Sequence, residues 1–117
     1  MSVAIRAEVE EIRRLPFGSI GAAYMGIGTA FTHPIRVITL KNATDVALSF
    51  SKGGVFDWID IEAGETQVYD LTSNKTIESG FVFELGTRIY VREHPLVLVA
   101  PSVGYVSLSV IYGETGL

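Results

Sequence analysis

Apolar and polar residues alternate most clearly through residues 104–113, close to the end of the printed chain. Every second residue from Val106 to Tyr112 is large and apolar or aromatic, and a glycine stands at each end of the stretch. Side chains alternate between the two faces of an extended strand, so this spacing predicts a strand with one face in the core. Tyr105 and Ile111 give the opposite face apolar character as well, which predicts a central strand between the core and a second covering surface.

Shorter stretches of the same kind are separated by residues typical of turns, such as Gly53, Gly64 and Gly86. We expect Asn42, Ala43, Thr44 and Asp45 to form a polar turn. The predicted strands are residues 19–27, 35–41, 46–51, 56–61, 66–71, 81–85, 88–93 and 104–113, with a further apolar passage at 96–100. The pattern predicts an all-β chain, a single-domain β-sandwich or jelly-roll-like barrel of about eight short antiparallel strands.

The first 16 residues fit more than one structure. Ile5, Val9 and Ile12 have helical spacing, whereas alternate apolar residues from Val3 to Val9 fit a strand. An extended arm that reaches a neighbouring subunit is the third alternative. Pro16 ends each of these, so we divide the chain into an N-terminal arm or first element, residues 1–16, and a β-sandwich or jelly-roll domain, residues 17–117.

Composition points towards contacts with other proteins. Charged residues make up 19% of the 117 residues and hydrophobic residues 48%, whereas soluble domains carry about 25% charged residues. A domain of this size cannot bury all its apolar side chains, and exposed apolar patches commonly mark interaction surfaces. The net charge of −4 argues against a nucleic-acid partner, because phosphate binding needs a basic surface. The absence of cysteine excludes disulfides and thiol nucleophiles.

No membrane or secretory segment is expected. Residues 1–14 lack the uninterrupted apolar run of a signal peptide. Residues 15–35 carry no Asp, Glu, Lys or Arg, but glycines and two prolines recur among them, which makes a poor membrane helix. We expect strand and turn at a packed interface there.

Candidate chemical groups do not form a recognised catalytic or metal-binding motif. The carboxylates suited in type to Ca²⁺ have the spacing of no calcium loop, and they are Asp57, Asp60, Glu62, Glu65 and Asp70. His33 and His94 each precede a proline and lie far apart in the chain. Ser19 and Ser102 have no nucleophile-elbow context, and the Gly26-Ile27-Gly28 stretch lacks the rest of a phosphate loop. We therefore predict no catalytic, cofactor or metal site. Asn42-Ala43-Thr44 and Asn74-Lys75-Thr76 match the N-glycosylation sequence, and we interpret both as turns.

Large apolar and aromatic side chains are the remaining functional candidates. They serve either core packing or an interface, and aromatic rings on an exposed sheet can also stack on sugars. The candidate interface residues are Ile5, Val9, Ile12, Phe17, Tyr24, Trp58, Tyr90, Tyr105 and Ile111.

Several short motifs, taken in their order and spacing, resemble small structural proteins of tailed bacteriophages. The motifs are Phe17-Gly18-Ser19-Ile20, His33-Pro34-Ile35-Arg36-Val37, Asn42-Ala43-Thr44-Asp45, Tyr69-Asp70-Leu71-Thr72-Ser73-Asn74-Lys75, Gly86-Thr87-Arg88-Ile89-Tyr90-Val91, Gly104-Tyr105-Val106 and Val110-Ile111-Tyr112-Gly113. Each motif alone is turn and strand chemistry, and the resemblance covers nearly the whole chain from Phe17 onward.

The resemblance implies a non-enzymatic component of the virion, assembled in the host bacterial cytoplasm. A capsid decoration (cement) protein is the first expectation, and a head-to-tail adaptor, neck or tail protein is the alternative. The implied partners are further copies of the chain, for example in a trimer, and the phage major capsid protein or neighbouring head and tail proteins.

Two other classes stay open on the residues alone. A carbohydrate-binding β-sandwich would place Trp58 in an exposed groove beside Asp57 or Asp60, whereas Trp58 in the core would argue against it. A small enzyme would need His33 or His94 to meet a carboxylate in a pocket.

Overall fold

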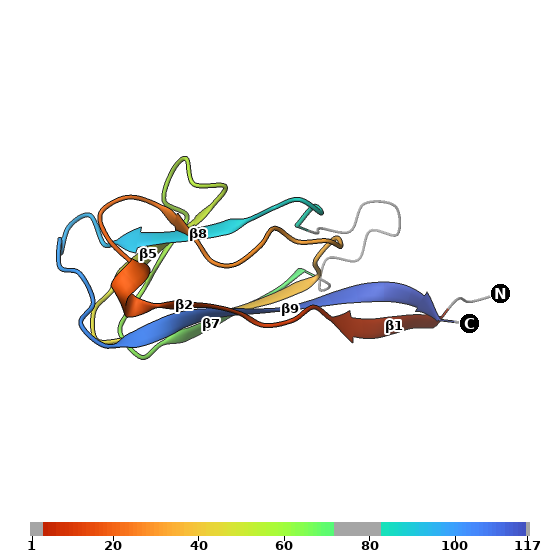
Figure 1. Ribbon diagram of the computed structural model, residues 1–117. Helices are drawn as coiled ribbons and strands as arrows, with labels where there is room; N and C mark the ends of the chain where they lie inside the picture. The colour runs from red at the N-terminus through yellow and green to blue at the C-terminus, as the bar shows by residue number, and fades with distance from the viewer. Residues whose placement is uncertain (1–3, 72–82, 117) are drawn as a thin grey trace.

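Two antiparallel β-sheets face each other, as Figure 1 shows, and an apolar core lies between them. The structure, a computed structural model, describes residues 4–71 and 83–116, and at residues 4, 5 and 114–116 it describes the backbone only. Nine strands are assigned in this part of the chain. The predicted all-β sandwich is confirmed.

The first sheet is built around the last strand of the chain. Strand β9 (Gly104–Gly116) pairs along one side with β4 (Val37–Thr44), which in turn pairs with β7 (Thr66–Asp70). Along its other side β9 pairs with β1 (Ala4–Val9) and then with β2 (Arg13–Pro16). The predicted central position of the 104–113 strand is therefore confirmed.

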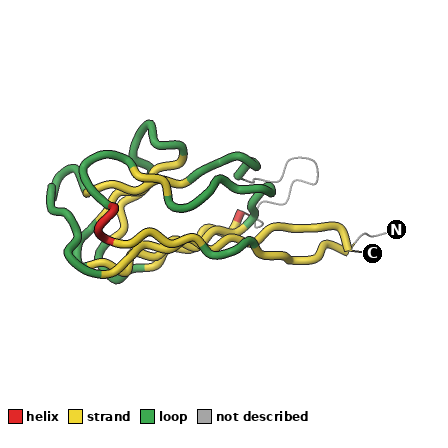
Figure 2. The backbone as a smooth tube through the Cα atoms, in the orientation of Figure 1, coloured by secondary structure: helices red, strands yellow, loops and turns green. Residues whose placement is uncertain are grey.

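The second sheet has shorter strands joined by longer loops, which Figure 2 shows as the upper layer. Its order is β3 (Met25–Gly26), β8 (Ile89–Glu93), β5 (Leu48–Lys52) and β6 (Ile59–Ile61). One turn of 3₁₀-helix, η1 (Phe17–Ser19), leads from β2 towards this sheet.

The core lies between the inner faces of β9 and β4 and those of β5 and β8. Val106 and Leu108 of β9 are fully buried, and Val110 is nearly so. Each large apolar side chain removed from water in this way stabilises the fold by about 1.5–3 kcal/mol. The buried apolar residues are Ile20, Ile27, Phe31, Ile35, Ile38, Leu40, Leu48, Phe50, Ile61, Ile89, Val91, Val106, Leu108 and Val110.

Strand β9 continues past the sandwich and forms a two-stranded ribbon with β1. The pairing of β4 with β9 ends at Val37 and Ile111, whereas β1 pairs with β9 as far as Gly116. In Figure 1 the ribbon extends to the right of the two layers, and the molecule measures 54 × 23 × 22 Å. We call this the ribbon end, and we call the opposite end, where residues 94–103 connect β8 to β9, the loop end.

The described N-terminal residues are strands held by their own sheet. Both β1 and β2 lie along β9, so the helical interpretation of residues 1–16 is wrong for residues 4–16. Residues 10–12 interrupt the pairing between the two strands.

Three local predictions were wrong. Residues 19–27 form η1, a loop and the two-residue β3 in place of a continuous strand. Residues 42–44 continue β4 where a turn was expected, because they pair with residues 104–106 of β9. The buried Asn42 amide also donates hydrogen bonds to the carbonyl oxygens of Val46 and Ile61 at 2.9 Å. Of residues 81–85, Phe83 forms an isolated bridge with Ile35 in place of a strand, and residues 81 and 82 lie outside the described residues.

Candidate functional site

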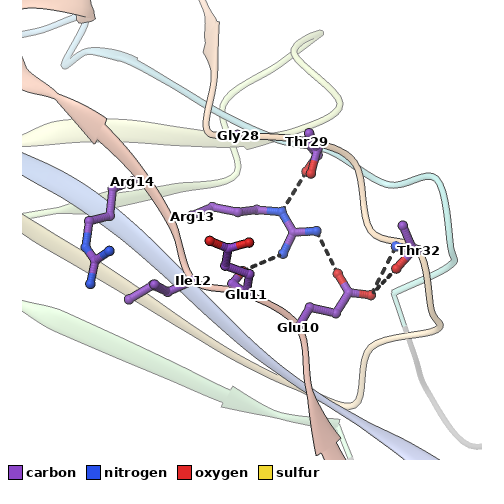
Figure 3. Close-up of a pocket in the computed structure, with 8 residues that line it drawn as sticks. All are labelled: Glu10, Glu11, Ile12, Arg13, Arg14, Gly28, Thr29 and Thr32. Atoms are coloured by element: carbon purple, nitrogen blue, oxygen red, sulfur yellow. Dashed lines mark hydrogen bonds and ion pairs between the residues drawn. The ribbon is translucent and has the colours of Figure 1, made fainter.

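A buried arginine fixes the junction between β1 and β2 to the loop that precedes β4. Arg13 is 8% exposed, and its Nε donates to the Thr29 carbonyl oxygen at 2.8 Å. Its Nη2 donates to the Ala30 carbonyl at 3.1 Å and to Glu10 Oε1 at 2.6 Å. Figure 3 shows Glu10 between the guanidinium and Thr32, in a cavity of about 420 Å³. We call Glu10, Arg13, Thr32 and His33 the polar clamp.

The Glu10 carboxylate is held in its ionised form. Burial raises its pKa, but hydrogen bonds from Arg13, His33 and Thr32 outweigh burial and lower the pKa from 4.5 to about 2. Glu10 Oε2 accepts from the Thr32 backbone N–H at 3.1 Å and from Thr32 Oγ1 at 2.9 Å. The clamp is therefore an ionic network that joins the connection between β1 and β2 to the loop that precedes β4.

His33 does meet a carboxylate, as the enzyme interpretation required, but the geometry differs from that of a catalytic triad. His33 Nδ1 lies 2.6 Å from Glu10 Oε2 and 3.1 Å from Thr32 Oγ1. In a triad the acid and the nucleophile bind different nitrogens of the imidazole ring. Here both lie at Nδ1, so His33 cannot pass a proton from Thr32 through the ring to a second site. The arrangement supports a structural role.

The loop end carries a run of exposed apolar residues. Leu96 is 88% exposed and Leu98 71% exposed, and Val97, Val99 and Val103 are each about half exposed. A stretch of consecutive exposed apolar residues is unfavourable in water unless another surface covers it. We call residues 96–99 the apolar loop. In Figure 1 it lies within the blue connection between β8 and β9, at the left of the view.

The apolar loop is held in a defined conformation. The His94 carbonyl accepts hydrogen bonds from the backbone N–H groups of Val97 at 3.1 Å and Leu98 at 2.9 Å. Leu98 has a φ of 57°, in the left-handed region that non-glycine residues rarely adopt. Such strain is kept where the surroundings impose it, commonly at functional positions.

Side chains anchor both ends of the apolar loop to neighbouring elements. His94 Nε2 lies 3.1 Å from Asp60 Oδ2 on β6, and His94 Nδ1 accepts from the Leu96 N–H at 3.1 Å. After the loop, the Ser102 N–H donates to Asp45 Oδ1 at 2.9 Å, and the Ser102 hydroxyl donates to the same carboxylate. These hydrogen bonds from Ser102 lower the pKa of Asp45.

An aromatic pocket of about 390 Å³ lies between the edges of the two sheets, on their ribbon-end side. Trp58 and Tyr69 pack at 5.0 Å between ring centroids, and Trp58 meets Phe83 edge-on at 5.6 Å. Lys52 Nζ lies over the Phe83 ring at 5.9 Å from its centroid. The lining residues are Lys52, Phe56, Trp58, Tyr69, Leu71 and Phe83.

Trp58 lies neither in an exposed groove beside Asp57 or Asp60 nor fully inside the core, the two alternatives considered from the sequence. It packs against the core while one side faces the aromatic pocket, and no carboxylate lies among the described residues that line the pocket. Asp57 instead forms a salt bridge with Arg92, at 2.6 Å between Oδ2 and Nη2, which lowers the pKa of Asp57. Asp60 contacts His94 at the loop end.

Most of the other candidate interface residues fall into two groups of exposed side chains. Phe17 and Tyr105, 38% and 37% exposed, lie at the loop end, where Pro16 pairs with Tyr105. Val9 pairs with Ile111 at the base of the ribbon, and Ile12 lies in the interruption between β1 and β2. The Ile5 side chain lies outside the described residues, although its backbone pairs with Thr115.

Two of the candidate tyrosines make contacts within the chain. The Tyr24 hydroxyl donates to Asp57 Oδ1 at 2.7 Å, and the Arg92 guanidinium lies 5.0 Å from its ring centroid. The Tyr90 ring lies beside Gly54, and Arg88 stacks over it at 5.3 Å. Both side chains are half-buried.

The remaining sequence candidates stay apart. His33 lies at the ribbon end and His94 at the loop end, and no group of three metal-binding side chains occurs among residues 4–71 and 83–116. Asn42 is buried and fully hydrogen-bonded in β4, so it is inaccessible to glycosylation in the folded chain. Asn74 lies outside the described residues.

Sequence reasoning missed the apolar loop and most of the aromatic pocket as surfaces. A continuous apolar run such as residues 96–100 is ordinarily buried, and only the prolines at 95 and 101 indicated an irregular connection. Phe56, Leu71 and Phe83 come from three separate segments, so their convergence depends on the pairing of the sheets.

No protein-family model, curated protein or solved structure matches this chain. In the part of the chain that the structure describes, no helix is long and apolar enough to cross a bilayer.

Proposed function

We propose that the chain is a non-enzymatic structural protein of a bacteriophage virion, a capsid decoration protein that stabilises the head through protein–protein contacts. The observation that carries the assembly role is the apolar loop, whose leucines are exposed although hydrogen bonds from its backbone N–H groups to His94 hold it in place. An exposed apolar surface that is ordered before binding loses little conformational entropy when a partner covers it.

The virion setting rests on the resemblance in sequence. The same surfaces would serve a head-to-tail adaptor or a neck or tail protein, and the position of the chain in a particle separates these roles from decoration. A carbohydrate-binding role is not proposed, because no carboxylate that would hydrogen-bond sugar hydroxyls lies among the described residues that line the Trp58 pocket.

Phage particles purified from cells that express the chain test this proposal. We expect the chain in mature particles in many copies, at regular positions on the head in a cryo-EM reconstruction. The doubly substituted Leu96→Ser/Leu98→Ser protein should fold, by circular dichroism, and should be missing from particles. Val68→Ser is the matched control, because Val68 is 59% exposed on β7, outside the apolar loop. Absence of the unaltered chain from particles would overturn the proposal.

A further inference from the structure

The apolar loop and the aromatic pocket lie at opposite ends of one sandwich. Lys52 in the pocket pairs with Ile89, the first residue of β8, whereas the loop follows Glu93, the last residue of that strand. Leu71 and Phe83 also lie at the ribbon end, through their hydrogen bonds to Arg36 and Ile35. The loop therefore cannot fill the pocket of its own chain.

Both surfaces are apolar, and the pocket has room for large side chains. The loop projects two large aliphatic side chains, Leu96 and Leu98, and the pocket has about 390 Å³ of space lined mainly by aromatic rings. Val55 and Phe56, 81% and 69% exposed, extend the apolar surface at the pocket edge. Apolar side chains from a partner would replace water at both surfaces at once.

The charges around the two surfaces are also complementary. Carboxylates flank the loop, because Glu93 precedes it, Asp60 contacts His94 and Asp45 binds Ser102. Lys52 lines the pocket. Arg36 and Arg88 lie at the same end of the sandwich, because their carbonyl oxygens accept hydrogen bonds from the Leu71 and Gly53 backbone N–H groups. Glu10, Asp70 and Glu84 also lie at this end, but no carboxylate is among the described residues that line the pocket. Opposite charge would orient the approach of the two surfaces.

We propose that the apolar loop of one copy docks in the aromatic pocket of a second copy, so that copies associate head to tail. A surface that binds a different surface on the next copy leaves a free loop and a free pocket at the ends of each pair. The contact therefore repeats until it closes into a ring or continues as a filament. This inference rests on the proposed assembly role and names a second copy as one partner.

Cysteine cross-linking tests the contact directly, because the chain has no cysteine of its own. Ala100→Cys places a thiol beside the loop and Val55→Cys places one beside the pocket, and neither change alters Leu96, Leu98 or the pocket lining. The two variants carry tags of different mass and are mixed under mild oxidation. We expect the mixed disulfide dimer to form at least ten times faster than either variant's dimer with itself. The double variant should give a ladder of multimers.

Two further proteins control this experiment. Ala63→Cys, exposed in the turn between β6 and β7, replaces Ala100→Cys and should cross-link to Val55→Cys at the slow background rate. Adding Leu96→Ser/Leu98→Ser to Ala100→Cys should reduce cross-linking to that same background, and Lys52→Glu in the pocket variant should slow it in low salt.

The outcomes separate this inference from the proposed function. Fastest cross-linking of Ala100→Cys to itself would show loop-to-loop pairing and would overturn the head-to-tail contact, as would a mixed rate equal to that of the Ala63→Cys control. Either result leaves the presence of the chain in virions intact. Rapid mixed cross-linking by a chain that is absent from particles would support the contact and remove the virion role.

Discussion

His33 stacks face to face on Tyr112, with 3.7 Å between ring centroids and 4° between ring planes. Tyr112 is the first residue of β9 beyond its pairing with β4, where the ribbon leaves the sandwich. His33 also contacts Glu10, which follows β1. One side chain of the loop before β4 therefore contacts β9 and the residue that follows β1, at the base of the ribbon. An isolated two-stranded ribbon is only marginally stable in water.

We expect His33→Ala to loosen the ribbon. The change removes a stacked pair worth about 0.5–1.5 kcal/mol and one hydrogen bond to Glu10. Hydrogen exchange of the amides of Ala4–Val9 should become several-fold faster, while amides of β5 and β8 keep their protection. His94→Ala is the control, since His94 lies at the loop end and should leave the ribbon unchanged. Unaltered exchange in His33→Ala would show that the strand pairing alone holds the ribbon.

Stability should fall in acid through Glu10. Its pKa is lowered in the folded state from 4.5 to about 2, so the ionised carboxylate contributes stability that is fully present above pH 4.5. That contribution is lost as the pH falls towards 2, and it amounts to about 2 kcal/mol after allowance for solvent screening.

Denaturant unfolding at pH 6, 4 and 2 measures this contribution. Glu10→Gln should be less stable than the unaltered chain at pH 6, and the two should converge at pH 2. The carboxyls of Asp45 and Asp57, whose pKa values are also lowered, contribute equally to both proteins and cancel in the difference. A gap between the two proteins that persists at pH 2 would mean that Glu10 acts through packing and not through its charge.

Gly104 permits the entry of the chain into β9. Its φ of 92° lies in the region that favours glycine, and a β-carbon there would overlap the carbonyl oxygen of Ala43 on β4. We expect Gly104→Ala to lower the free energy of unfolding by about 3 kcal/mol or more. Gly18→Ala is the matched control, because a β-carbon at Gly18 would contact nothing within 4 Å. Equal stability of the two variants by thermal unfolding would contradict this.

The two faces of β9 should respond differently to substitution. Val110 is 2% exposed in the core, so Val110→Asp would bury an unpaired carboxylate and should prevent folding. Ile111 is 38% exposed on the outer face, and Ile111→Ser should cost less than about 1 kcal/mol. Circular dichroism and denaturant unfolding of the isolated protein measure both. If Ile111→Ser unfolds as readily as Val110→Asp, the outer face is also essential to the fold.

The sequence alone was sufficient to predict the all-β class, the central position of β9 and which of its side chains enter the core, because alternation along one strand is a local property. Candidate interface residues were also chosen from the sequence, and the structure leaves five of them at least partly exposed: Val9, Ile12, Phe17, Tyr105 and Ile111.

Only the tertiary structure decided where the functional surfaces lie. The polar clamp joins Glu10 to His33, and the aromatic pocket joins Phe56, Tyr69 and Phe83, through pairings between segments far apart in the chain. The position of the apolar loop depends on contacts at its two ends, His94 with Asp60 on β6 and Ser102 with Asp45 after β4. Local periodicity carries no information about such contacts, because a run of apolar residues has the same sequence pattern whether the folded chain buries it or leaves it exposed.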